Sequence, residues 1–170
     1  SETAEAGGEP SAAVGRFRQL ALGTLVLAGL QIWLGGWVSS SGAAMACSEF
    51  PTCHGAWAIP SGTLEWLQMG HRATGFTLAG VVAALSVAAV KTDGLERTVR
   101  VVSITLSALV VAQILIGWFN VAYYVPVPTS ALHTAVAAAI FGTLTFVVGH
   151  FWLPTPTAPW APPASSFRSR

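Results

Sequence analysis

Two histidines are the residues of this chain best placed to do chemistry. His71 and His133 each lie three to four residues into a long apolar run. If these runs are transmembrane helices, the two imidazoles lie at nearly the same depth in the bilayer, because a helix rises about 1.5 Å per residue. A metal-binding side chain inside a membrane span is costly and marks a candidate functional site. A lone histidine at a helix end is usually an interfacial polar residue, whereas a matched pair suits a bis-histidine haem, whose iron takes an axial ligand from each face. The spacing therefore predicts that His71 and His133 bind one haem iron.

The composition is that of a membrane protein. Of the 170 residues, 53% are hydrophobic and only 9% are charged, whereas soluble domains carry about 25% charged residues. A helix needs about 20 apolar residues to cross the hydrocarbon core, and residues 20–40, 67–90, 101–123 and 130–153 are long enough. We therefore predict an all-α membrane protein, a bundle of four transmembrane helices. The net charge of +1 does not indicate nucleic acid as a partner.

The ends of the chain differ in composition from its centre. Both are rich in Ala, Gly, Ser and Pro, which predicts disordered tails over residues 1–18 and 154–170 around a haem-binding domain at 19–153. The outer loop of that domain covers residues 41–66. The first apolar stretch is long and lacks a small-residue cleavage site, so no cleavable signal is expected.

The basic residues predict the topology. Lys and Arg precede the first span, fill the connection between the second and third, and recur in the C-terminal tail. The other two connections, residues 41–66 and 124–129, contain neither. The positive-inside rule then places both termini in the cytoplasm and these two loops outside the plasma membrane.

The four spans resemble one helical hairpin repeated. The string QIWLGGW at residues 31–37 is similar to QILIGWF at 113–119, and His71 and His133 follow in the next span of each half. The separation is 40 residues from Gln31 to His71 but 20 from Gln113 to His133, and the extra 20 residues are the first outer loop. Each hairpin would thus bring one histidine to a pseudo-twofold site.

The only two cysteines, Cys47 and Cys53, lie in the first outer loop. The outer side of a membrane is oxidising, which favours a disulfide between them. A crosslink closing so short a loop adds less stability than one closing a long loop. The bridge is therefore either a redox-active pair over the outer site or a structural staple, and the sequence leaves both open.

Three polar residues flank His71. Gln68 is three residues earlier, on nearly the same helix face, and Glu65 is about one turn earlier still, at the membrane boundary. Both are candidate catalytic residues. Arg72 is able to pair bidentately with a haem propionate, or to extend toward the interface as a snorkelling cation.

The other two histidines are not expected to bind this haem. His54 follows Cys53 in the outer loop and is expected at the surface. His150 is 17 residues beyond His133, which is about 25 Å along a helix.

These motifs together resemble those of the haem A synthase family over roughly residues 20–150. The matching strings are GGWV at 35–38, SG at 41–42, C-x5-C-H-G at 47–55, HR at 71–72, QILIG at 113–117 and LH at 132–133. The resemblance implies oxidation of a methyl group of haem o to the formyl group of haem a, by successive hydroxylations, for terminal oxidase biogenesis. It also implies that His71 and His133 are axial ligands and that Cys47 and Cys53 form the loop disulfide.

The usual bacterial member of that family has eight spans in two four-helix halves, one for the substrate haem o and one for a haem b cofactor. This chain resembles the cysteine-bearing N-terminal half alone, and short four-span versions assemble as oligomers. The resemblance therefore implies a homo-oligomer in membrane lipid, with haem o synthase or terminal oxidase assembly factors as partners.

One position departs from the family pattern. The catalytic half typically has a glutamate three residues before the first histidine, and here that residue is Gln68, as in the haem-b-binding half. An amide cannot exchange a proton as a carboxylate does. The alternatives are therefore a non-catalytic b-type haem protein for electron transfer or haem handling, and a structural subunit of a respiratory complex.

Overall fold

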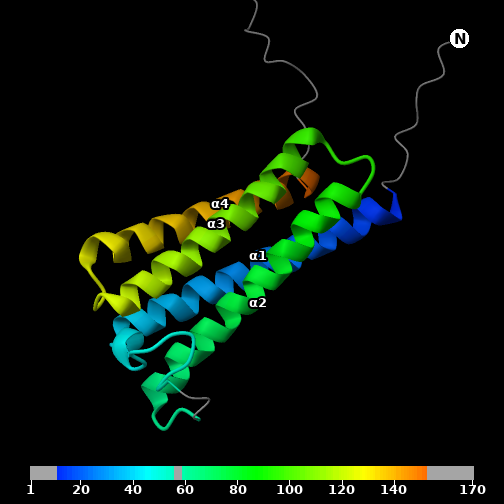
Figure 1. Cartoon of the computed structure of the whole chain (residues 1–170). Coiled ribbons are helices and arrows are strands. Elements are labelled where there is room, and N and C mark those ends of the chain that lie inside the picture. The colour runs from blue at the N-terminus through cyan, green and yellow to red at the C-terminus, as the bar shows by residue number, and fades with distance from the viewer. Residues whose placement is uncertain (1–10, 56–58, 153–170) are drawn as a thin grey trace, which may run out of the picture.

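Four long helices make up the described part of the protein. The computed structural model describes residues 11–55 and 59–152, and all four helices are long and apolar enough to cross a membrane. The prediction of an all-α, four-span membrane protein is confirmed. In chain order the elements are α1 (Ala12–Ser40), a short 3-10 helix η1 (Ala43–Met45), α2 (Thr63–Lys91), α3 (Arg97–Ala122) and α4 (Val127–Trp152) (Figure 1).

The first helix begins earlier than predicted. The side chain of Ser11 accepts a hydrogen bond from the Val14 amide and caps the helix, which starts at Ala12 rather than near residue 20. Residues 12–18, expected in a disordered tail, are therefore helical. The stretch contains two arginines, which lower its hydropathy, but Ala and Arg are strong helix formers. The rest of both predicted tails, residues 1–10 and 153–170, lies outside the described residues.

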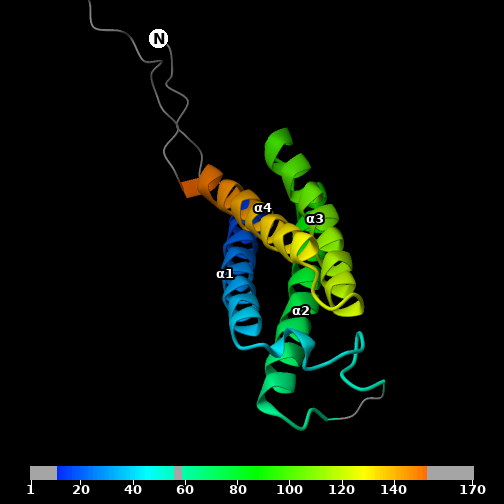
Figure 2. The same cartoon turned by 90° about the vertical axis from the view of Figure 1, so that its left-hand side faces the viewer.

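The helices form a ring in which each packs against two neighbours. α1 contacts α2 and α4, and α3 contacts α2 and α4, so that α2 and α4 are diagonally opposite. The loop end of the bundle carries the connection with Cys47 and Cys53. The basic end carries the start of α1 and the α2–α3 connection (Figure 1). Figure 2 shows α4 running obliquely to α1, nearest to it at the basic end.

The apolar core occupies only the half of the bundle toward the basic end. Its buried members come from residues 17–28 of α1, 78–89 of α2, 95–110 at and within α3, and 140–147 of α4. In the other half of the described helices, the buried side chains are Val38 and two polar residues, Gln68 and Arg72. The inward positions of that half are therefore not filled by a buried apolar cluster.

Candidate functional site

The His71 ring is held by a residue of the neighbouring helix. Nε2 of Gln31 in α1 lies 3.1 Å from Nδ1 of His71 and donates a 3.0 Å hydrogen bond to the His71 carbonyl oxygen. The hydroxyl of Thr74 donates to Oε1 of the same amide. The amide nitrogen only donates, so in this contact Nδ1 of His71 is the acceptor and the proton of the neutral ring lies on Nε2. Metal binding through Nε2 requires the other tautomer, in which Nδ1–H donates to Oε1 of Gln31 after the amide has turned over.

Each candidate ligand packs against a glycine of the preceding helix. A Cβ atom added at Gly35 would lie 3.0 Å from Cε1 of His71, and one added at Gly117 would lie 3.1 Å from Cε1 of His133. Such distances are shorter than ordinary van der Waals contact, so a side chain at either glycine would displace the ring.

The two histidines approach the bundle interior from diagonally opposite helices. His71 is on α2 and His133 is on α4, which pack against α1 and α3 but not closely against each other. Both histidines lie beyond the apolar core, in the half that has no buried apolar cluster. The arrangement can offer one imidazole to each face of a flat ligand.

Polar atoms near His133 lack partners. Within residues 11–55 and 59–152, the buried side-chain atoms without a hydrogen bond are Gln113 Oε1, Asn120 Oδ1, Ser130 Oγ and His133 Nδ1. All four belong to the loop-end halves of α3 and α4. Buried polar groups are normally paired, and unpaired ones point to a ligand, an ion or water. This part of the bundle is therefore chemically suited to a polar or metal-containing group.

An open groove of about 450 Å³ leads along α1 in the same half. Its lining residues are Trp33, Gly36, Trp37 and Ser40. These residues lie on the same face of α1 as Gly29. A Cβ atom added at Gly29 would lie 3.6 Å from Phe141 of α4. Beyond that contact α4 diverges from α1, and an added Cβ at Gly36 would meet nothing within 4 Å.

Gln68 binds the cysteine loop. Its side chain is only 3% exposed. Oε1 accepts a 2.5 Å hydrogen bond from the Cys47 amide, and Nε2 donates a 2.7 Å hydrogen bond to the Ala44 carbonyl. Both bonds together require an amide, because an ionised carboxylate accepts hydrogen bonds but cannot donate one. Gln68, which departs from the family pattern, is thus complementary to the loop backbone: its oxygen meets an N–H group and its nitrogen meets a carbonyl group.

Arg72 lies beneath the same loop. Its Nη1 atom donates to the carbonyl oxygens of Glu49 at 2.6 Å and Thr52 at 2.7 Å. Its Nη2 atom donates to the carbonyl oxygen of Cys47 at 2.9 Å. The side chain is 9% exposed. Pairing with a haem propionate stays a prediction, and the structure provides the guanidinium with a different set of partners.

The structure joins Cys47 and Cys53 in a disulfide. Both residues are buried, at 0% and 1% exposure. Solvent therefore has little access to either sulfur in this conformation. This shielding, together with the contacts of Gln68 and Arg72, favours the structural interpretation of the bridge over the redox-active one.

Glu65 lies at the edge of the loop rather than beside His71. Its carboxylate accepts a 2.7 Å hydrogen bond from the Ser61 amide and lies 3.2 Å from Nε2 of His54. His54 itself is half exposed. The remaining histidine, His150, pairs at 3.1 Å with Glu96 at the basic end. The structure therefore brings His71 together with Gln31 and Gly35, and it separates Glu65, His54 and His150 from them.

The family model described as "Cytochrome oxidase assembly protein" (COX15-CtaA) matches residues 3–145. The chain therefore belongs to this family. It is similar to proteins named "Heme A synthase": it is 25% identical to that of Bacillus mycoides (strain KBAB4) over 126 residues, 74% of this chain and 40% of the relative. It is 26% identical to that of Shewanella oneidensis over 156 residues, 78% of this chain and 46% of the relative.

A second kind of relative is named "Protoheme IX farnesyltransferase". The protein of that name from Haloquadratum walsbyi is 28% identical over 129 residues, 76% of this chain but 27% of the relative. The chain thus spans less than half the length of each of these relatives.

Proposed function

We propose that this membrane protein binds haem between His71 and His133 and is a haem A synthase-like oxidoreductase that converts haem o to haem a. The proposal is carried by one arrangement: two imidazoles on the diagonal helices α2 and α4, each against a glycine, beyond the apolar core. Family membership supports it. When bound, haem would supply the iron and the redox chemistry of the site.

The residues of the chain would hold and orient that haem. His71 and His133 would hold the haem iron through their Nε2 atoms, and Gln31 would orient the His71 ring through Nδ1. The groove with Trp33 and Trp37 on α1 is largely apolar and suits an apolar substituent of the ligand. The apolar core below would keep water away from the inner face of the site.

A non-catalytic b-type haem protein is the second candidate, and Gln68 favours it. The position at which the catalytic half of the family typically has glutamate is occupied here by an amide whose two polar atoms both bind the loop backbone. Glu65, the other candidate catalytic residue, is bound to Ser61 and His54. Catalytic roles for Gln68 and Glu65 remain proposals.

A second copy of the chain is the proposed partner. The relatives named haem A synthase are more than twice as long as the region that this chain matches. A homo-oligomer would bring a second four-helix unit beside the first. We place the loop end outside the plasma membrane and both termini in the cytoplasm, because the basic residues gather at the opposite end.

The test is to identify the haem and follow its conversion. The full chain would be purified from cells with and without a co-expressed haem o synthase, and its haem extracted and identified by chromatography and mass. Haem a that appears only when haem o is supplied supports the synthase. Haem b alone in both preparations supports the second candidate, and a haem-free protein in both would reject both candidates.

A further inference from the structure

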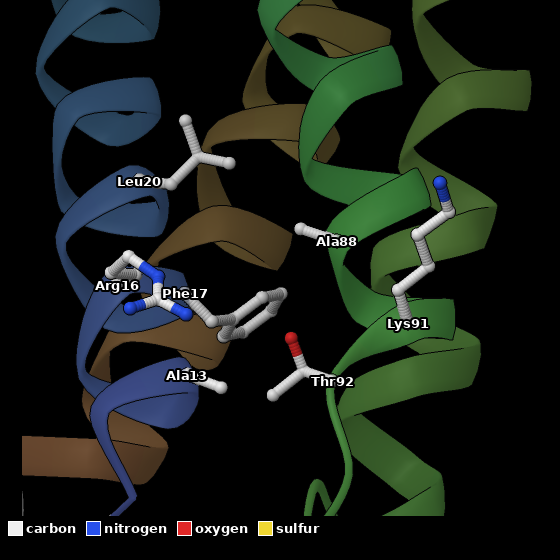
Figure 3. Close-up of a pocket in the computed structure, with 7 residues that line it drawn as sticks. All are labelled: Ala13, Arg16, Phe17, Leu20, Ala88, Lys91 and Thr92. Carbon is white, nitrogen blue, oxygen red and sulfur yellow. The ribbon is translucent and has the colours of Figure 1, made fainter.

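A small crevice that is not part of the haem site lies between α1 and α2 at the basic end of the bundle. It has a volume of about 260 Å³ and lies at the basic end, on the opposite side of the apolar core from His71. Its lining residues are Ala13, Arg16, Phe17, Leu20, Ala88, Lys91 and Thr92 (Figure 3). We propose that this crevice binds the head group of an anionic phospholipid.

The lining of the crevice has an apolar part and a polar part, as a lipid with an acyl chain and a charged head group requires. Phe17 is 2% exposed and, with the partly buried Leu20 and Ala88, gives an apolar wall that continues toward the hydrocarbon core. The hydroxyl of Thr92 points into the gap between α1 and α2 (Figure 3). An acyl chain can lie along this wall while its phosphate stays at the mouth beside the hydroxyl.

Two cations flank the mouth. Arg16 on α1 and Lys91 on α2 are both exposed and line the crevice. In Figure 3 the Lys91 side chain extends along α2 rather than toward Arg16, and its four-carbon stem is flexible enough to turn to the mouth. Basic pockets between transmembrane helices at the cytoplasmic side suit anionic lipid head groups.

Two of the other cations of this end have partners within the protein. Arg18 donates to the Phe151 carbonyl, and Arg100 donates to the carbonyls of Ala89 and Thr92. Among residues 11–55 and 59–152, by contrast, neither Arg16 nor Lys91 makes a side-chain hydrogen bond or ion pair. The crevice lining contains no carboxylate, and its charge is therefore available to a phosphate.

The test is a lipid titration of the purified full chain by native mass spectrometry. Dioleoylphosphatidylglycerol should bind more tightly than dioleoylphosphatidylcholine. Arg16→Gln should weaken phosphatidylglycerol binding about fivefold, and Arg16→Gln with Lys91→Gln about 25-fold, because each cation near a membrane surface contributes about 1 kcal/mol. Arg97→Gln is the matched control, since it removes the same charge from the same end outside the crevice. Ala88→Leu narrows the crevice without changing charge and should weaken binding as well.

Several outcomes would overturn the proposal. Equal losses in Arg16→Gln and Arg97→Gln would mean diffuse attraction to surface charge. No effect of Ala88→Leu would mean that the crevice is not entered. Displacement of the lipid by millimolar inorganic phosphate would make the site one for a free anion. Unchanged elution and melting temperature would verify folding, and Lys91→Gln alone carries the test if Arg16→Gln fails to fold.

Discussion

Nε2 of Gln31 lies 3.1 Å from Nδ1 of His71, across the contact between α1 and α2. This contact holds the ring through Nδ1, and binding of a metal at Nε2 would require the Gln31 amide to turn over so that its oxygen accepts from Nδ1–H. Among the described residues, Gln113 Oε1 and His133 Nδ1 are by contrast both buried without a hydrogen-bond partner. The His71 ring is thus held by a neighbouring side chain, whereas the polar atoms around His133 are not.

Replacing Gln31 should weaken haem binding without unfolding the bundle. Gln31→Leu removes the hydrogen bond to the ring, and loss of such a supporting partner typically costs about 10–100-fold in metal affinity. Gln19→Leu makes the same change at an exposed position of α1 and should have no effect. Haem dissociation, measured by transfer to apomyoglobin, gives the comparison. Equal dissociation rates in the two variants would mean that Gln31 does not support the ligand.

The glycines beside the histidines should resist even the smallest side chain. Gly35→Ala and Gly117→Ala would place a methyl group 3.0–3.1 Å from an imidazole carbon, and overpacking of this kind costs about 1–3 kcal/mol. We expect a displaced ring, an altered haem spectrum and a lower melting temperature.

Gly23→Ala is the matched control for Gly35→Ala on the same helix. Its added methyl group would meet nothing within 4 Å, and alanine favours a helix over glycine by about 1 kcal/mol. Gly23→Ala should therefore keep the spectrum and be as stable as the parent or slightly more so. A normal haem spectrum in Gly35→Ala would contradict the contact described here.

We expect substitutions at Arg72 and Gln68 to disturb the cysteine loop more than they change haem binding. Arg72→Lys keeps the charge but loses the fork that reaches several carbonyls, so we expect the Cys47–Cys53 bond to be reduced and alkylated faster while haem content is retained. If Arg72 instead binds a propionate, the variant would lose haem while the alkylation rate stays the same.

Gln68→Glu tests whether an amide or a carboxylate at that position better supports stability and haem a production. The change removes the donor to Ala44, and a buried group left unsatisfied costs about 1–3 kcal/mol, so the melting temperature should fall. A carboxylate can also stabilise the electron-poor carbon formed as a methyl group is oxidised, so the variant should raise haem a production if the parent is limited by this residue. Parent protein that already makes haem a efficiently, with no gain in Gln68→Glu, would show that the carboxylate is dispensable.

The four spans were predictable because hydropathy is a strong signal, whereas haem binding by His71 and His133 stays a prediction. The role of Gln68 was harder to predict. It lies three residues before His71, which suggested a shared face, but four residues before Arg72, which at 100° per residue is the better alignment. Glu65, Gln68 and Arg72 form one stripe that faces the loop. The hydrogen bonds to the loop depend on several backbone carbonyl groups pointing toward the same side chain. No sequence pattern predicts such an arrangement.

The early start of α1 was missed for a related reason. A span predicted from hydropathy ends where charged residues begin. The helix itself extends further toward the N-terminus, to Ala12, because these residues favour a helix and Ser11 caps it. The partial core was not predictable either, since apolar residues occur along the full length of every span. Which of them are buried depends on how the four helices pack, including the oblique course of α4 (Figure 2).

The absorption spectrum of purified protein carrying substitutions at the two histidines tests the central claim most directly. The parent and the surface control His54→Ala should show a six-coordinate, low-spin haem. His71→Ala and His133→Ala should each lose haem or convert it to a high-spin form, because each removes one axial ligand. Low-spin spectra identical to the parent in both variants would contradict bis-histidine ligation by these residues.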